Sequence, residues 1–203
     1  MKLRAIHLAA AATLLFTGCF SFPKFGAAQK IERDRLKRAI EVNPANAHAA
    51  FSLGKTNLDA GEFDAAAGYF AKAVATNPKF EEAWLGLGIS RLESGNLSGA
   101  EDAYRKLLAF SPESAGAYEG LATISLERRD LPKAADMANK ALAIDPKSAQ
   151  GLRVLGETHY IKGEYAQALE VWDRNRTEAG GDAGRDPFQN DLRQYLEKYG
   201  AGR

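Results

Sequence analysis

The sequence predicts an all-α protein built as an α-solenoid of antiparallel helix pairs. Four of the seven prolines stand 34 residues apart, at Pro44, Pro78, Pro112 and Pro146. Two further columns keep the same step: Leu53, Leu87, Leu121, Leu155 and Ala66, Ala100, Ala134, Ala168. Within each unit the apolar residues recur every three or four positions, which is the helical period. A fixed period of this length is typical of stacked supersecondary units, so the 203 residues form one short solenoid.

The first residues predict an export signal. Lys2 and Arg4 precede an apolar run at 5–16, and about twelve such residues are too few to span a bilayer core. They suit the apolar region of a secretory signal peptide. The run ends on Leu15-Phe16-Thr17-Gly18-Cys19, which resembles a bacterial lipobox with Phe16 where that motif usually has Leu.

The lipobox resemblance implies a lipoprotein signal peptide over 1–18 and acylation of Cys19, the only cysteine. Acyl chains on Cys19 would anchor the protein in a membrane, since each buried methylene contributes about 0.8 kcal/mol. Phe20, rather than Asp, follows the cysteine, and the sorting rule of such lipoproteins then implies the periplasmic face of the outer membrane. The alternative is ordinary cleavage after Gly26-Ala27-Ala28, which gives a soluble periplasmic protein without Cys19.

A tether and a half-repeat are expected next. Residues 19–28 contain Pro23 and Gly26 and have no helical period, so they are predicted to be a tether. Residues 29–44 place Ile31, Leu36 and Ile40 near one helical face and end at the first periodic proline. This segment is predicted to be the second half of a repeat, shielding the first complete unit.

Four complete repeats follow, at 47–80, 81–114, 115–148 and 149–180, each predicted to be two helices joined by a turn. Gly61, Gly95 and Gly163 occupy the turn, where glycine accepts a positive φ at little cost. Arg129 stands there in the third repeat, so we expect that turn to be built differently. Each repeat ends at its proline, because the residue before a proline is driven out of the helical region; the fourth has Gly180 there instead.

A second set of columns predicts how the helices pack. Small residues are expected where the two helices of a pair approach, and larger side chains in the next column fill the gap to the following unit. That filling column reads Phe70, Tyr104, Ala138 and Trp172.

The best-preserved unit resembles the tetratricopeptide repeat, TPR, at Trp84, Leu87, Gly88, Ala100, Tyr104 and Pro112. The resemblance extends from residue 43 to about 178 and implies a right-handed α-solenoid. After a glycine-rich loop, residues 186–199 are predicted to be a helix, with Asp186 as its cap and Pro187 at its first position. We expect this helix to cap the last repeat, and docking of a partner helix is the alternative.

Composition and motifs give no indication of an enzyme, a metal site or a cofactor. A net charge of +1 argues against a nucleic-acid-binding surface. Apart from His7 in the signal, the two histidines, His48 and His159, are more than 100 residues apart, and a single cysteine cannot form a disulfide within the chain. We therefore predict a protein that binds other proteins.

The TPR resemblance implies that ligands bind on the concave wall, at fixed places of each first helix. The candidates for this groove are Phe51, Lys55, Leu58, Leu85, Ile89, Leu92, Glu119, Thr123, Arg153, Glu157 and Tyr160. Phe51, Leu85 and Ile89 are the strongest, because exposed apolar patches mark interaction sites. The ladder of Leu58, Leu92, Leu126 and Tyr160 fits core packing equally well. An amphipathic helix or an extended segment is the expected ligand.

The layout predicts a membrane-anchored scaffold that binds envelope proteins and assists assembly or localisation of a complex. It resembles the pilotins of type IV pilus and secretin systems, and TPR lipoproteins that recruit peptidoglycan hydrolases or proteases. A soluble periplasmic chaperone or carrier is the alternative, and a subunit of an enzyme complex is a third hypothesis. Neither the partner protein nor the oligomeric state follows from the sequence.

Overall fold

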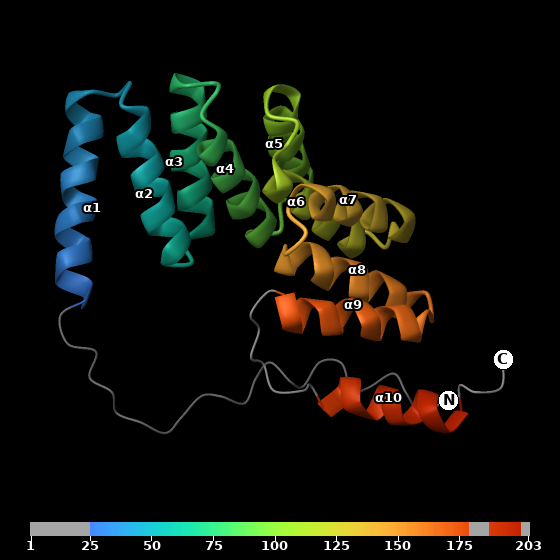
Figure 1. Ribbon diagram of the computed structural model, residues 1–203. Helices are drawn as coiled ribbons and strands as arrows, with labels where there is room; N and C mark the ends of the chain where they lie inside the picture. The colour runs from blue at the N-terminus through green and yellow to red at the C-terminus, as the bar shows by residue number, and fades with distance from the viewer. Residues whose placement is uncertain (1–24, 179–186, 200–203) are drawn as a thin grey trace.

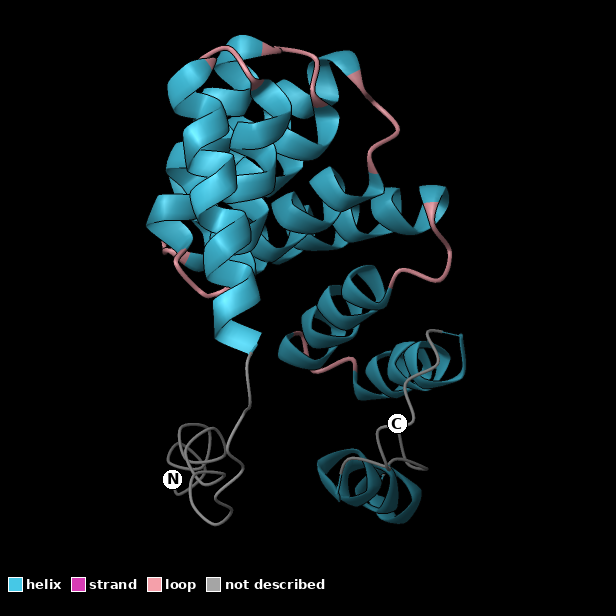
Figure 2. Ribbon diagram, turned by 90° about the vertical axis from the view of Figure 1, so that its left-hand side faces the viewer, coloured by secondary structure: helices cyan, strands magenta, loops and turns pink. Residues whose placement is uncertain are grey.

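The computed structural model describes residues 25–178 and 187–199, and within these ranges it contains ten α-helices and no strand (Figures 1 and 2). The helices are α1 Phe25–Val42, α2 Ala47–Asp59, α3 Phe63–Thr76, α4 Glu81–Glu93, α5 Leu97–Phe110, α6 Ala115–Glu127, α7 Leu131–Ile144, α8 Ala149–Ile161, α9 Tyr165–Glu178 and α10 Pro187–Tyr199. None of these helices is both long and apolar enough to cross a membrane. The predicted signal peptide, Cys19 and Gly180 lie outside the described residues.

Each complete repeat forms one helix pair, in which a first helix of 13 residues is followed by a second helix of 14. The pairs are α2 with α3, α4 with α5, α6 with α7, and α8 with α9, and each pair contacts the next through a shared face. The row of helices turns along the chain, since α1 to α4 stand nearly upright in Figure 1 whereas α7 to α9 lie across the view. The expected α-solenoid is therefore confirmed.

The turn between the two helices of a pair has one backbone geometry in all four repeats. Gly61, Gly95 and Gly163 have φ values of +74°, +79° and +80°, as expected for glycine in the left-handed region. The expectation of a different third turn was wrong, because Arg129 has φ +61°. Its N–H donates to the Leu126 carbonyl at 2.9 Å, as the Gly61 N–H does to Leu58 at 2.9 Å. The helices on either side force this arginine into a conformation that costs L-residues free energy.

The periodic prolines end the second helices as expected. The residues that precede them, Asn77, Ser111 and Asp145, have φ near −125° and positive ψ, outside the helical region. Proline imposes this by steric contact with the backbone of the residue before it. The next first helix then starts three residues after each proline.

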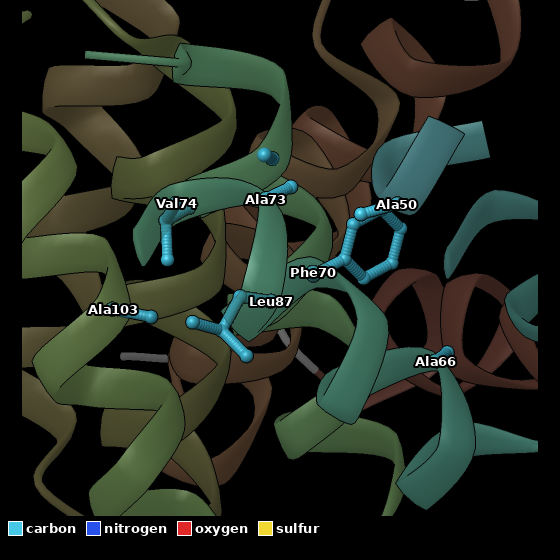
Figure 3. Close-up of a cluster of buried hydrophobic side chains, with 8 residues drawn as sticks. Ala50, Ala66, Phe70, Ala73, Val74, Leu87 and Ala103 are labelled. Atoms are coloured by element: carbon cyan, nitrogen blue, oxygen red, sulfur yellow. The ribbon is translucent and has the colours of Figure 1, made fainter. Parts of the chain in front are cut away.

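Phe70 and Tyr104 each fill the gap between two repeats, as the column of large side chains predicts. Figure 3 shows Phe70 from α3 beside Ala50 and above Leu87, inside a cluster of buried apolar residues. A Cβ atom on Gly54 or Gly86 would lie 2.7 or 2.6 Å from this ring, so α2 and α4 approach Phe70 through glycines. Tyr104 of α5 is held in the same way between Gly88 and Gly120. Burial of a large aromatic side chain contributes about 2 to 3 kcal/mol.

The terminal helices extend the solenoid by one layer at each end. Helix α1 packs on α2, and Arg33 forms an ion pair with Glu62 at 3.2 Å. It starts at Phe25, so residues 25–28 of the expected tether are helical, because the two alanines after Gly26 are strong helix formers. Ile31 is 70% exposed, and the covered part of the expected stripe begins at Leu36.

Helix α10 packs against α9, beneath it in Figure 1, and Arg193 donates a charge-assisted hydrogen bond to Asp173. Leu192 and Leu196 are half-buried, whereas Tyr195 is 56% exposed. Helix α10 thus contacts the last repeat through α9.

Candidate functional site

The first helices form the inner wall of the solenoid. Consecutive first helices contact one another, α2 with α4, α4 with α6 and α6 with α8, whereas consecutive second helices in the described ranges do not. A curved stack is tighter on its concave side, so α2, α4, α6 and α8 line the concave face. The predicted groove residues all belong to these helices, and except for the exposed Lys55 they are half-buried.

A pocket opens in this wall where α4 faces α6. It has a volume of about 270 Å³. Its lining is Leu85, Ile89, Leu92, Glu93, Tyr104, Gly116, Glu119, Gly120, Thr123 and Gln150. Five of the predicted groove residues, Leu85, Ile89, Leu92, Glu119 and Thr123, thus lie around one space. The structure does not bring Phe51, Lys55, Leu58, Arg153, Glu157 or Tyr160 to this pocket.

Small residues of the third repeat create the pocket. Gly116 stands where the other repeats have His48, Glu82 and Gln150, and a Cβ on Gly116 would lie 3.1 Å from Leu85 Cδ1. A longer side chain at this place would therefore cover Leu85. Because Gly116 has no side chain, the aliphatic residues of α4, Leu85, Ile89 and Leu92, stay open on the concave face.

Tyr104, a residue of the second helix α5, also lines the pocket. The sequence does not predict this contact. The Tyr104 ring is buried between Gly88 and Gly120, with 1% of its surface exposed, yet the residue is part of the lining. Burial, with smaller contributions from the carboxylates of Glu93 and Glu119, raises the pKa of Tyr104, so its hydroxyl stays protonated. The only signal in the sequence is that Tyr104 carries the one hydroxyl in a column that otherwise reads Phe70, Ala138 and Trp172.

A polar network joins α6 to the fourth repeat and uses four of the predicted groove residues. Ser148 Oγ donates to Glu119 Oε1 at 2.5 Å, and Gln150 Nε2 donates to Thr123 Oγ1 at 2.8 Å. Arg153 donates to Gln150 Oε1 at 3.1 Å and to Glu157 Oε1 at 2.7 Å. Ser148 and Gln150 therefore link Glu119 and Thr123 of α6 to the start of α8, whereas Arg153 and Glu157 pair within α8. Gln150 was not among the candidates.

Aromatic side chains cover the groove at its N-terminal end. The Phe51 ring lies 4.9 Å from Phe80 and 5.7 Å from Phe70, measured between centroids, and the His48 ring lies 5.2 Å from Phe80 in a tilted arrangement. Phe80 occupies the N-cap position of α4 but forms no side-chain cap, and it packs on the core instead. Phe51 thus packs against two aromatic rings, whereas Leu85 and Ile89 line the pocket.

The ladder of every thirty-fourth residue also contacts the core. Leu58, Leu92 and Leu126 each pack against a different buried cluster, which joins their own repeat to the next. Tyr160 lies 5.5 Å from Tyr165 and 5.9 Å from Trp172, between ring centroids. Leu92 alone of the four also lines the pocket. The ladder is therefore mainly a packing feature.

The described residues include no group of three His, Cys, Asp or Glu side chains placed to hold a metal ion. His159 Nδ1 lies 2.6 Å from Glu164 Oε2, across the turn between α8 and α9. His48 contacts only an aromatic ring among the interactions described above. Both histidines thus have local structural contacts.

Comparison with known proteins agrees with this architecture. The family model for the tetratricopeptide repeat matches residues 33–79, 58–115, 85–149 and 120–183. A search of the curated proteins finds no match.

Solved structures share the fold at low sequence identity. The crystal structure of MamA has a TM-score of 0.67 at 19% identity, with 91% of this chain and 100% of that chain covered. PilF of Pseudomonas aeruginosa has a TM-score of 0.66 at 19% identity, covering 87% of this chain and 88% of that one. YrrB, described as a TPR protein with an unusual peptide-binding site, has a TM-score of 0.61 at 17% identity, covering 82% and 86%.

The matched segments overlap and together span 33–183, which is more than half of the chain and includes all four helix pairs. The 34-residue columns, the repeated turn and the aromatic residues between glycines are the physical basis of that match. The chain belongs to the tetratricopeptide repeat family, whose members are scaffolds for protein–protein interaction.

Proposed function

We propose that this protein is a non-enzymatic, membrane-anchored scaffold that binds cell-envelope proteins in its concave groove and assists assembly or localisation of their complex. The open pocket between α4 and α6 supports the proposal most directly. It combines the aliphatic wall of Leu85 and Ile89 with polar groups at one edge. Pockets with that combination bind ligands by apolar burial and orient them by a few polar contacts.

The anchor is proposed from the lipobox-like stretch that ends at Cys19. An acylated Cys19 would hold the solenoid close to the outer membrane, and residues 20–24 with α1 would separate the groove from the lipid. Assembly of a pilus or secretin is one envelope process that fits this layout, and recruitment of a peptidoglycan hydrolase or protease is another. PilF shares the fold, which at 19% identity supports the architecture alone.

Metabolic labelling with a palmitate analogue tests the anchor. We expect label on the wild-type protein and none on Cys19→Ala, with the variant moving from the membrane fraction to the soluble periplasmic fraction. Absence of label on the wild type would overturn the anchor and support the soluble chaperone or carrier.

Photo-crosslinking in living cells tests the groove. A photoreactive residue at Leu85 or Ile89 is expected to capture a protein partner, and one at Phe51 to capture it less well because Phe80 covers that ring. The control is Ala109 on α5, which is exposed on a second helix. Crosslinks from Ala109 but not from Leu85 or Ile89 would show that the partner binds the outer face, contrary to the proposal.

A further inference from the structure

The charged residues that line the pocket between α4 and α6 are both acidic, Glu93 and Glu119. The groove places of these two helices carry four carboxylates, Glu82, Glu93, Glu119 and Glu127, and no basic residue. The nearest groove cations belong to other helices, Lys55 to α2 and Arg153 to α8, and Arg153 is already paired with Glu157 at 2.7 Å. The carboxylates around the pocket are therefore not neutralised by the wall itself.

The floor of the pocket adds a second, independent observation. The Tyr104 side chain is 1% exposed and lines the pocket, and its hydroxyl has no hydrogen-bond partner within the described ranges. The Tyr104 oxygen is not among the fully buried atoms that lack a partner, so it is open to the pocket, where a ligand group can form a hydrogen bond with it. The Tyr104 hydroxyl lies among acidic groups. A cationic N–H group can donate a hydrogen bond to the hydroxyl oxygen and also neutralise the carboxylates.

The remaining lining fixes the shape of the ligand group. Leu85, Ile89 and Leu92 form an aliphatic wall beside the carboxylates of Glu93 and Glu119. Glu119 receives one hydrogen bond from Ser148 at Oε1, which leaves its second oxygen available, and Glu93 is exposed. A long aliphatic stem that ends in a cation matches this order of apolar wall and acidic rim, as the side chains of lysine and arginine do.

We propose that this pocket receives a lysine or arginine side chain from the bound protein, presented by a segment with aliphatic neighbours. The inference rests on the groove being the protein-binding surface. The aliphatic stem packs on Leu85 and Ile89, while the ammonium or guanidinium group donates to Glu93, to the free oxygen of Glu119 and to the Tyr104 hydroxyl. An acidic side chain in the pocket would be repelled by the carboxylates, and a purely apolar one would remove water from these polar groups without replacing its hydrogen bonds.

Selection from a randomised peptide library displayed on phage, with the folded protein as bait, tests the proposal. The wild type is expected to enrich peptides in which Lys or Arg lies beside aliphatic residues. The double variant Glu93→Gln/Glu119→Gln should lose that enrichment, and synthetic copies of the selected peptides should bind it about ten-fold more weakly. Glutamine at 119 keeps an acceptor for Ser148, so the link to the fourth repeat survives.

The matched control is Asp102→Asn/Glu170→Gln, which removes the same two charges from the second helices, where both residues are exposed. It should leave peptide affinity unchanged, which separates a local ion contact from the overall charge. Tyr104→Phe removes only the hydroxyl. It should weaken the binding of peptides that contain Lys or Arg more than the binding of analogues with norleucine at that position.

Two failures are distinguishable. If peptides are selected without enrichment of Lys or Arg, or if the selected peptides bind Glu93→Gln/Glu119→Gln as well as wild type, the cation site is overturned and the groove still stands as a protein-binding surface. If no peptide is enriched and photo-crosslinks from Leu85 and Ile89 fail as well, both the cation site and the groove are overturned.

Discussion

At Arg129 a side chain occupies a backbone position that glycine holds in the other three repeats. Its φ of +61° lies in the left-handed region, where an L-residue with a Cβ atom loses about 1 to 2 kcal/mol. The turn nevertheless keeps the same hydrogen bonds as the glycine turns. The contacts of α6 with α7 therefore outweigh the local preference of one residue.

Arg129→Gly is expected to stabilise the protein by about 1 kcal/mol, because glycine accepts this φ without steric cost. Urea unfolding followed by circular dichroism measures the difference. Arg129→Ala is the control, since alanine has the same Cβ and should give no gain. A loss of stability in Arg129→Gly would show that the arginine side chain contributes more than its backbone costs.

At Gly120 glycine is required by the lack of space for a side chain, and not by a positive φ. A Cβ at this position would clash with the Tyr104 ring, whereas a Cβ on Gly68 of α3 would meet nothing within 4 Å. We expect Gly120→Ala to destabilise the protein by about 1 to 3 kcal/mol through overpacking. Gly68→Ala should instead stabilise it by about 0.5 to 1 kcal/mol, because alanine is the better helix former. Equal effects of the two substitutions in thermal unfolding would contradict the close approach of α6 to Tyr104.

At the scale of elements, Glu101 links one repeat to the next. This residue of α5 is 8% exposed and pairs with Arg128 at the end of α6, with Lys133 of α7 at 3.3 Å and with Arg105 at 2.6 Å. The hydrogen bond from Arg128 is the main cause that holds the pKa of Glu101 below its usual value of 4.5, with Lys133 and Arg105 adding to it against the opposing effect of burial. A buried carboxylate with three cationic partners connects α5 to both helices of the third repeat.

Glu101→Gln is expected to lower the free energy of unfolding at neutral pH by about 1 to 3 kcal/mol, since it removes a charge-assisted interaction. Because the folded pKa is lower than the unfolded one, the ionised carboxylate stabilises the fold above about pH 4.5, and this contribution is lost as the pH falls below that value. Urea unfolding of the wild type and the variant across this pH range should show the two curves converge in acid.

Asp136→Asn is the matched control for Glu101. Asp136 pairs with Lys140 on an exposed surface, so its loss should cost less than about 1 kcal/mol. A constant difference between Glu101→Gln and wild type down to the most acidic pH would contradict the assigned role of ionised Glu101.

In the whole molecule, stability is shared along the row of helices rather than held in one core. Most of the buried apolar residues in the described ranges fall into three clusters, each made of residues from adjacent repeats. Helices α4 to α7 have a repeat on both sides, whereas α10 packs only on α9 within the described ranges. In such a linear stack, each unit is stabilised by its own helices and by the interfaces with its neighbours.

Hydrogen exchange measured by mass spectrometry should follow this arrangement. We expect the slowest exchange in α4 to α7 and the fastest in α10 and the first turns of α1, because terminal units lack one interface. A profile with the slowest exchange in α9 and α10 would mean that the C-terminal cap, and not the central repeats, dominates the stability.

How much of the groove could be predicted depended on what each residue contacts. Leu85, Ile89, Leu92, Glu119 and Thr123 line the pocket, and the helix face that they share follows from the 34-residue register. The contact of Phe51 with Phe80 was not predictable, since Phe80 stands at the N-cap of α4, where its side chain cannot cap the helix and packs on the core. Tyr104 was predicted to be a packing residue, and its place in the pocket lining was not predictable, because it depends on how closely the ring fits between Gly88 and Gly120 of two neighbouring repeats.

The sequence by itself determined the helix pairs, their register and their stacking, because helical period, proline junctions and small residues at close contacts are local properties repeated every 34 residues. The tertiary structure alone decided where the wall is open. The pocket exists because Gly116 of one repeat lies 3.1 Å, measured from a Cβ built on it, from Leu85 of the repeat before. Such an opening depends on the size of two residues that meet only when the repeats stack, and the periodicity within one repeat does not predict it.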